Sequence, residues 1–377
     1  MERYLSDEYL RGFETRALPN GALCVTAYTG HDAALTVPSE LDGAPVAEIA
    51  DGCFADCDFL EEIVISEGIE RLGDSAFEGC TRLERAQLPQ SLERIGQVCF
   101  ARTALRSVAL PPMVQTVPRR AFYMCAALEE ARFSRQLFCI EDEAFYGCER
   151  LLGVRLPEGI REIGAFAFAF SGLARLNLPY GVREIGRQAF AFCTRMIALE
   201  LPEGLIALGD SAFNGCIQLE TALLPATLEA VQGNPFRSCQ KLSEVNISPE
   251  NPVLVSQDGV AFFRKERRLF CYPCAKPDKS YAFPKGIREI GDYAFAGNRN
   301  LETLRLPEGL RRVGEGAFRW CDALARVTVP ASVAEIGMGA FHGCERLMSA
   351  RVTEGSAAHR HFQKLGVPLQ LQPNYEE

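Results

Sequence analysis

The sequence predicts a repeat solenoid, mainly β, built from short stacked coils. Three observations predict it: a Phe that recurs at a nearly fixed spacing, apolar residues that keep phase with it, and a second recurrent position three residues later. The chain has 24 Phe but one Trp, as expected if one structural position repeatedly selects Phe. The recurrent residues are Phe54, Phe77, Phe100, Phe122, Phe145, Phe168, Phe190, Phe213, Phe236, Phe295, Phe318 and Phe341.

The spacing of these Phe residues defines the coil. Successive copies lie 23, 23, 22, 23, 23, 22, 23, 23, 59, 23 and 23 residues apart, a register that random composition does not hold. One coil of this length cannot bury its own apolar face. Stacked coils share a core, so we expect each Phe to pack on the Phe above and below it.

Within each coil, a short strand follows the Phe. In the coil after Phe145, Leu151, Val154 and Leu156 are the apolar positions, and the last two alternate with one polar residue. This period of two indicates a strand with one buried face. Pro157 ends the strand because it lacks the N–H that a sheet ladder needs. An Ile-Gly turn and an Ala-Phe step then close the coil.

The second recurrent position holds nine Cys, and the other three copies have small hydrogen-bonding residues there. The two 22-residue spacings occur where Thr103 and Ser171 replace Cys. This covariation suggests a tight turn with two solutions, one using a thiol and one using a hydroxyl. We interpret the thiols as small buried apolar groups with a weak S–H donor. Adjacent coils lie within the Cα distance of a disulfide, so oxidation of neighbouring pairs stays open.

The pattern A-F-x-G-C-x-x-L-x-x-L-x-L-P-x-x-L/I-x-x-I-G resembles the BspA-type leucine-rich repeat of bacteria and some protozoa, over about residues 20–353. The chain departs from the commonest leucine-rich repeat, because the place of its usual Asn or Cys holds residues such as Ser91 and Gly159. The resemblance implies a right-handed solenoid with a parallel sheet on one face, used for attachment to proteins. Many members of the family are surface-exposed adhesins.

The ends of the chain lack the repeat and predict caps, which shield terminal coils from water. Ser356 is placed to begin a helix and Gly366 to end it, and VPLQLQ alternates like a last strand. The predicted boundaries are 1–17 for an N-terminal extension with a helix from Ser6 to Arg16, 18–53 for an N-terminal cap, 54–247 for nine coils, 248–283 for an insertion, 284–353 for three coils and 354–377 for a C-terminal cap.

The 59-residue gap contains the insertion. Its apolar runs Gly259–Phe263 and Arg268–Tyr272 flank a charged turn at residues 265–267, which predicts a β-hairpin. This hairpin either protrudes from the stack or continues it irregularly.

Composition limits the partners. The net charge of -9 argues against nucleic acid and against an anionic membrane surface. The N-terminus lacks the basic and apolar segments of a signal peptide, and 15 Cys suit a reducing compartment. We therefore expect a cytoplasmic location, or a secreted or cell-surface one if a leader has been removed.

The sequence offers no catalytic motif, cofactor motif or metal-ligand set. Its four His fall in the N-terminal cap, a turn and the C-terminal segment, so a shared site is not expected. Cys271 and Cys274 form a lone C-x-x-C without a second ligand pair for zinc. An enzyme or thiol-redox protein that uses this pair is the alternative to a binding module.

The outward residue between the last two apolar strand positions forms a column that changes character along the array. In its middle, Arg side chains lie beside apolar ones, a common composition of protein interfaces. A merely solvated sheet face would explain the same residues. We expect a non-enzymatic, adhesion or scaffold-like module that binds a protein, or less readily a glycan, through Arg132, Leu152, Arg155, Arg175, Asn177, Ile197, Glu200 and Leu223.

Overall fold

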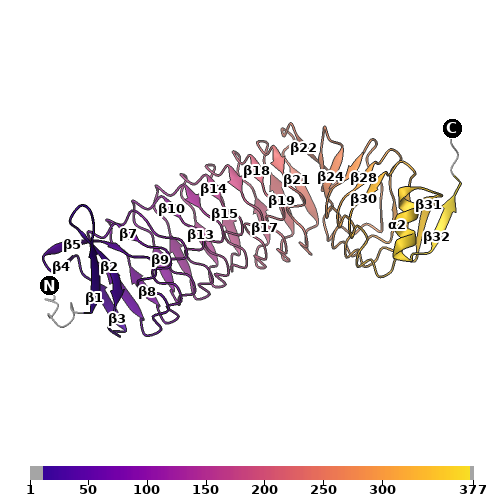
Figure 1. Cartoon of the computed structure of the whole chain (residues 1–377). Helices are drawn as coiled ribbons and strands as arrows, with labels where there is room; N and C mark the ends of the chain where they lie inside the picture. Colours follow the sequence, from indigo (N-terminus) through magenta and orange to yellow (C-terminus); the bar gives the residue numbers. More distant parts are fainter. Residues whose placement is uncertain (1–11, 374–377) are drawn as a thin grey trace. The chain divides into compact units, whose positions relative to one another are not determined.

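The computed structural model describes residues 12–373, and the chain divides into two compact units, residues 1–193 and 194–377 (Figure 1). Each unit is a stack of β coils with parallel sheets, and α2 (Ala357–Leu365) is the α-helix of the described part. The mainly-β solenoid with a parallel sheet face is therefore confirmed.

In the first unit, the regular coils contribute strands to two successive parallel sheets, one of three and one of four strands, that we together call the sheet face, and most contribute a shorter strand to a second set. Figure 1 shows the two sets along different sides of the stack. The sheet face consists of β3 (Ala34–Val37), β6 (Glu62–Ile65), β8 (Arg85–Gln87), β9 (Ser107–Ala109), β11 (Glu130–Arg132), β13 (Gly153–Arg155) and β15 (Arg175–Asn177). The second set includes β7 (Arg71–Leu72), β10 (Thr116–Val117), β12 (Cys139–Ile140), β14 (Glu162–Ile163) and β16 (Glu184–Ile185).

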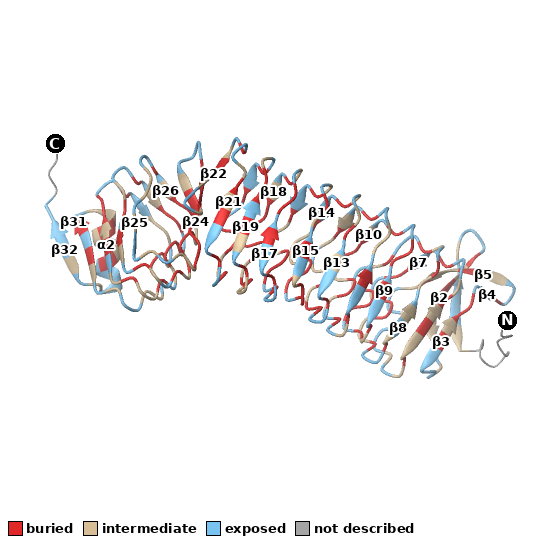
Figure 2. Ribbon diagram, turned by 180° about the vertical axis from the view of Figure 1, so that it is seen from behind, coloured by how far each residue is buried: buried red, intermediate tan, exposed pale blue. Residues whose placement is uncertain are grey.

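The recurrent Phe residues form a continuous stack inside the first unit. From Phe54 to Phe190 each ring is fully buried, and successive ring centroids lie 5.1–5.6 Å apart with interplanar angles of 1–8°. The predicted packing of Phe on Phe is confirmed. Figure 2 shows the buried positions recurring from coil to coil.

The recurrent Cys position ties neighbouring coils together. The thiol of Cys80 donates to the carbonyl oxygen of Phe54 at 3.0 Å, and Cys125 donates to that of Phe100 at 3.0 Å. Thr103 uses its hydroxyl differently, since it donates to Phe100 of its own coil at 2.9 Å. The two solutions expected from the 22-residue spacings are therefore both present. All 15 Cys are free thiols within the described residues.

A backbone requirement explains the Gly of the repeat. The second residue after each recurrent Phe has positive φ in all twelve copies, and Gly79 (φ 73°) and Gly147 (φ 74°) adopt this conformation without strain. Phe170 and Phe192 occupy the same position with φ of 58°, where bulky residues are strained. Both side chains are exposed, and their rings stack at 4.5 Å.

The start of the described chain is a strand. β1 (Phe13–Ala17) pairs antiparallel with β2 (Leu23–Tyr28), and Phe13 packs on Tyr28 at 4.9 Å. The predicted helix is therefore wrong for residues 13–16, because the hairpin gives the first coil a paired edge; residues 6–11 lie outside the described part. The remaining strands of this end are β4 (Glu40–Leu41) and β5 (Ala44–Ile49).

The second unit repeats the arrangement with one irregular coil. Its sheet-face strands are β17 (Ala198–Glu200), β19 (Thr221–Leu224), β21 (Glu244–Ile247) and, after the insertion, β25 (Ser280–Tyr281), β27 (Thr303–Arg305), β29 (Arg326–Val329), β31 (Ser349–Thr353) and β32 (Leu369–Gln372). The other strands are β18 (Ala207–Leu208), β20 (Ala230–Val231), β22 (Leu254–Gln257), β23 (Val260–Phe263), β24 (Arg268–Cys271), β26 (Glu289–Ile290), β28 (Arg312–Val313) and β30 (Glu335–Ile336).

The insertion continues the stack. β23 and β24 form the predicted antiparallel hairpin, and β24 then pairs parallel with β26. Tyr272 lies 23 residues before Phe295 and takes the place of the recurrent Phe, with its ring stacked on Phe295 at 4.5 Å and 18°. Alignment on Phe alone overlooks this residue. Its buried hydroxyl donates to Asp278 Oδ2 at 2.8 Å.

Helix α2 covers the last coil. Ser356 Oγ accepts a hydrogen bond from the His359 N–H at 3.1 Å, and Gly366 ends the helix with φ of 71°. The predicted helix limits are confirmed. Phe362 is fully buried against Phe341 at 4.8 Å, so the helix shields the end of the Phe stack. The predicted last strand, β32, pairs parallel with β31.

Candidate binding face

The outward column follows the strand register in each unit. In the first unit, Ala109, Arg132, Arg155 and Asn177 are successive Cα partners across β9, β11, β13 and β15. In the second unit, one run joins Glu200, Leu223 and Asn246, and another joins Arg305, Thr328, Arg351 and Gln370.

Five of the predicted binding residues lie together on the first unit. Arg132, Arg155 and Asn177 belong to the column, and Arg175 points to the same face because it precedes Asn177 by two residues. Leu152, next to β13, is 51% exposed, and its carbonyl oxygen accepts a hydrogen bond from the Ala174 N–H on the neighbouring coil. All five residues are exposed.

The other three predicted residues lie on the second unit. Glu200 and Leu223 are Cα partners on β17 and β19, and Ile197 directly precedes β17. Ile197 is 57% exposed and Leu223 41% exposed. Two exposed apolar side chains and one carboxylate thus come from two neighbouring coils.

Of the three arginines among the predicted binding residues, one is neutralised by a carboxylate. Arg132 bonds to both carboxylate oxygens of Glu130, at 2.6 and 3.2 Å, and this pairing raises the pKa of Arg132. Within residues 12–373, no carboxylate lies within ion-pair distance of Arg155 or Arg175. The uncompensated positive charge is therefore carried by two arginines.

Arginines of the preceding coils are also paired, but with carboxylates of the adjacent coil. Arg85 Nη2 lies 2.9 Å from Glu62 Oε2 on the adjacent strand, and Arg106 Nη2 lies 3.2 Å from Glu84 Oε2. Arg82 pairs with Glu61. These coils present a sheet face in which most of the positive charge is neutralised.

Sequence reasoning missed a hollow on the sheet face of the second unit, which we call the arginine hollow. Its volume is about 610 Å³, and strands β25, β27, β29, β31 and β32 line it. Its charged residues are Arg305, Arg326, Arg351 and Glu308. Arg305 and Arg351 belong to the outward column that the sequence identifies. The residue pattern of that column does not indicate that the surface is hollowed there.

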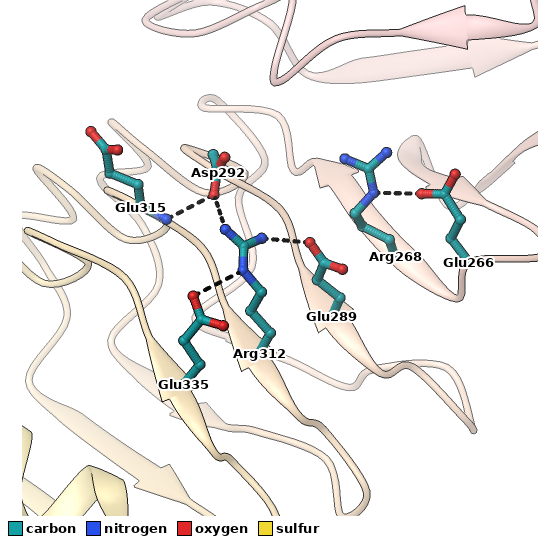
Figure 3. Close-up of polar contacts among 7 residues, drawn as sticks. All are labelled: Glu266, Arg268, Glu289, Asp292, Arg312, Glu315 and Glu335. Atoms are coloured by element: carbon teal, nitrogen blue, oxygen red, sulfur yellow. Dashed lines mark hydrogen bonds and ion pairs between the residues drawn. The ribbon is translucent and has the colours of Figure 1, made fainter.

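The other side of the same unit carries a compensated cluster. Arg312 Nη1 lies 2.6 Å from Glu289 Oε1, its Nη2 2.9 Å from Asp292 Oδ1 and its Nε 3.4 Å from Glu335 Oε1 (Figure 3). These contacts join three successive coils, since β26, β28 and β30 each contribute one partner. The charges of this cluster compensate one another, so they need no ligand, and the ion pairs stabilise the stack.

The C-x-x-C pair is buried. Cys271 is 1% and Cys274 6% exposed, and the Cys274 thiol donates to the Ala296 carbonyl oxygen at 3.3 Å. Burial raises the pKa of Cys274 to about 12 and that of Cys271 well above its usual value. Reactive thiols need an exposed, stabilised thiolate, so this geometry does not favour redox chemistry.

Residues 12–373 contain neither a metal-ligand cluster nor a membrane-spanning helix. No group of three or more His, Cys, Asp or Glu side chains is arranged to hold a metal ion there. In that same range, the helix is too short and polar to cross a membrane.

Comparison with known proteins agrees with the repeat. The model of the BspA type leucine rich repeat region matches residues 47–174, 161–257 and 267–360. A leucine rich cell surface protein from Faecalibacterium prausnitzii has a similar structure, with a TM-score of 0.57, 21% identity, and 95% of this chain and 96% of that chain covered. A leucine-rich repeat protein from Bacteroides ovatus has a TM-score of 0.56 and 19% identity, covering 98% of this chain and 100% of that chain. The curated proteins contain no match. Because the family model covers most of the sequence, the chain belongs to the BspA-type leucine-rich repeat family.

Proposed function

We propose that this chain is a non-enzymatic protein-binding module, adhesive or scaffold-like, that recognises its partner through the sheet face. The observation that supports it is the pair Arg155 and Arg175, which lack carboxylate partners in the described chain and lie beside exposed Leu152. Family membership supports an interaction role, without identifying the partner.

The composition of this surface suits a protein interface. Arginine is enriched at interfaces because its guanidinium both hydrogen-bonds and stacks, while an apolar neighbour contributes buried area. Neighbouring strands lie about 4.8 Å apart, so Arg155 and Asn177 meet a partner side by side. Ile197, Glu200 and Leu223 are proposed as a contact group of the second unit.

The alternative, an enzyme or thiol-redox protein that uses Cys271 and Cys274, has less support because both thiols are buried and protonated at neutral pH. A glycan partner would favour exposed aromatic residues over arginine pairs at the contact.

The location remains a prediction between the cytoplasm and the cell surface. The F. prausnitzii protein is named a cell surface protein, which gives the cytoplasmic prediction no support.

The test is affinity capture with the full chain from the source organism, followed by titration of the captured partner. The variant Arg132→Ala/Arg155→Ala/Arg175→Ala is expected to bind the partner at least about 10-fold more weakly, because hot-spot arginines dominate interface energies. The matched control is Arg82→Ala/Arg85→Ala/Arg106→Ala, which removes the same charge from paired positions. Unchanged binding by the first variant would contradict the proposed site. Fractionation of the same cells decides the location.

A further inference from the structure

We propose that the arginine hollow binds an acidic segment of a protein, in which Asp or Glu carboxylates pair with Arg305, Arg326 and Arg351. The proposal rests on the proposed function in one respect, that the partner is a protein. It concerns a different surface from the residues named above, on the sheet formed by β25, β27, β29, β31 and β32. Figure 2 shows β31 and β32 at the C-terminal end of this sheet.

The strand register sets out the three arginines as a triangle. Arg305 and Arg351 flank Thr328 in one outward column, two strand spacings or about 10 Å apart. Arg326 precedes Thr328 by two residues, so it lies on the same face and displaced along β29 by about 7 Å. All three side chains are exposed.

Their charge is only partly compensated by the chain, since Glu302 on the neighbouring coil attracts Arg326 without forming an ion pair with it, and Arg326 helps to lower the pKa of Glu302. Within the described residues, no carboxylate lies within ion-pair distance of Arg305 or Arg326, and Arg351 contacts only the amide oxygen of Gln370, at 3.3 and 3.2 Å. The Cα partners of Arg326 are Thr303 and Ser349, whereas Arg85 of the first unit has Glu62 as a Cα partner. Glu308 is the one acid among the lining residues. The hollow is therefore a local positive site in a chain of net charge -9.

The remaining lining suits a peptide. Thr303, Thr328 and Ser349 supply half-buried hydroxyls that donate to carboxylates or backbone carbonyls. Tyr281 and Phe283 form an aromatic wall, and Tyr281 is held by an edge contact with Tyr272 at 5.0 Å. The floor consists of buried Leu304 and Val327. A wall and floor fixed by the core reduce the conformational entropy lost on binding.

The spacing favours an extended segment over a small anion. A single carboxylate or phosphate reaches one or two guanidinium groups when these stand about 10 Å apart, whereas about three residues of extended chain cover that distance. Guanidinium and carboxylate form two parallel hydrogen bonds, which gives each contact a defined direction. An Asp- or Glu-rich segment therefore satisfies all three arginines together.

The experiment uses the full chain and a fluorescein-labelled peptide of roughly 12 residues with Glu at alternate positions, followed by fluorescence anisotropy. We expect Arg305→Gln/Arg326→Gln/Arg351→Gln to weaken binding by at least about 10-fold, because three arginine–carboxylate pairs are lost together. The matched control Arg82→Gln/Arg85→Gln/Arg106→Gln removes the same charge from paired arginines, and its affinity should stay within about 2-fold. A peptide with Gln in place of Glu should not bind.

A charge reversal guards against misfolded variants. Arg305→Glu/Arg326→Glu/Arg351→Glu should lose the acidic peptide and gain a Lys-containing one of the same length. Equal losses in the hollow and control variants would overturn the proposal, because binding would then follow net charge alone. Binding of heparin without binding of the peptide would overturn it in favour of a sulfated glycan. Since the probe replaces the natural partner, these failures leave the Arg132, Arg155 and Arg175 test intact, and the reverse also holds.

Discussion

The two units are built on the same interior, but only the first keeps it uniform. In the first unit the stack from Phe54 to Phe190 has interplanar angles of 1–8°. In the second unit Tyr272 interrupts the column of Phe, and the angle between Phe295 and Phe318 widens to 33°. The second unit also buries amide side chains, including Asn251 and Asn298, whereas the buried polar side chains described in the first unit are the hydroxyl residues Thr103 and Ser171.

Each polar group in the irregular coil has a partner. Asn251 Nδ2 donates to the carbonyl oxygens of Pro225 and Leu228, both at 2.9 Å, and Tyr272 donates to Asp278. These bonds compensate the desolvation that burial would otherwise cost. The insertion thus extends the stack without leaving these groups unpaired.

The sheet face also differs between the first coils of the first unit and the coils after the insertion. The first coils neutralise their sheet-face arginines with Glu, whereas the coils after the insertion leave Arg305 and Arg326 without a carboxylate in the described residues. Tyr281 and Phe283, which come from the insertion, wall the arginine hollow. The irregular coil therefore changes the core and also shapes the surface beside it.

The largest expected effect tests what the units share. Phe145→Ala removes a fully buried ring that stacks at 5.2 Å on both Phe122 and Phe168, and should cost about 3–5 kcal/mol of unfolding free energy. Phe318→Ala should cost a similar amount, since its ring lies 5.0 Å from both neighbours. Denaturant unfolding measures both. A loss below about 1 kcal/mol for either variant would contradict a Phe stack as the main core.

Alkaline pH tests the shared Cys position. Burial raises the pKa of Cys125 to about 11, so the folded state holds this proton more tightly than the unfolded chain does. The stabilisation is complete below the unfolded thiol pKa of about 8.5 and is lost as pH rises toward 11, by roughly 1.4 kcal/mol per pH unit for each thiol. Cys125→Ser keeps a donor and removes the titration. Its unfolding free energy should therefore fall less steeply between about pH 9 and pH 10 than that of the original chain. If the unfolding free energies of the two proteins fall with equal slopes, ionisation of the Cys125 thiol does not contribute to the loss of stability at alkaline pH.

A reciprocal exchange tests the interruption of the Phe column. Tyr272→Phe removes the hydrogen bond to Asp278 and should cost about 1 kcal/mol. Phe145→Tyr places a hydroxyl among fully buried rings and should cost about 1–3 kcal/mol unless the ring shifts to find a partner. The control is Asp278→Asn in the Tyr272→Phe background, which should add only the loss of the ion pair between Lys276 and Asp278 if Tyr272 and Asp278 act as a pair. If Tyr272→Phe stabilises the chain, the polar core of the irregular coil is not a stabilising feature.

Much of the fold could be predicted from the sequence because the repeat encodes it locally. The spacing of Phe fixes the coil, and the alternation around Val154 and Leu156 fixes which side chains face the core. The caps at Ser356 and Gly366 depend on side chains within a few residues, so they were predictable too.

What the sequence did not predict depends on partners distant in sequence or on a substituted residue. Tyr272 fills a Phe position, and β1 depends on pairing with β2. The depth of the arginine hollow arises because residues 280–283 of the insertion stand beside later coils. For Arg132 a signal existed, since Glu130 lies two residues earlier on the same strand face.

The smallest expected effect tests the sheet face itself. Arg106→Gln removes an exposed ion pair with Glu84 and should lower the unfolding free energy by up to about 0.5 kcal/mol. Arg326→Gln removes a charge that has no carboxylate within ion-pair distance among the described residues and only a longer-range attraction to Glu302, so stability should change less than in Arg106→Gln. Because exposed charges are screened by salt, the difference between the two variants should disappear at about 1 M NaCl. Glu84→Gln in the Arg106→Gln background isolates the pair. If Arg326→Gln destabilises the chain as much as Arg106→Gln does, then Arg326 has a structural role. The arginines of both sheet faces would then stabilise the fold, although their neighbours differ. If it does not, Arg326 contributes little to the free energy of unfolding, as expected of a residue whose role is to bind a ligand.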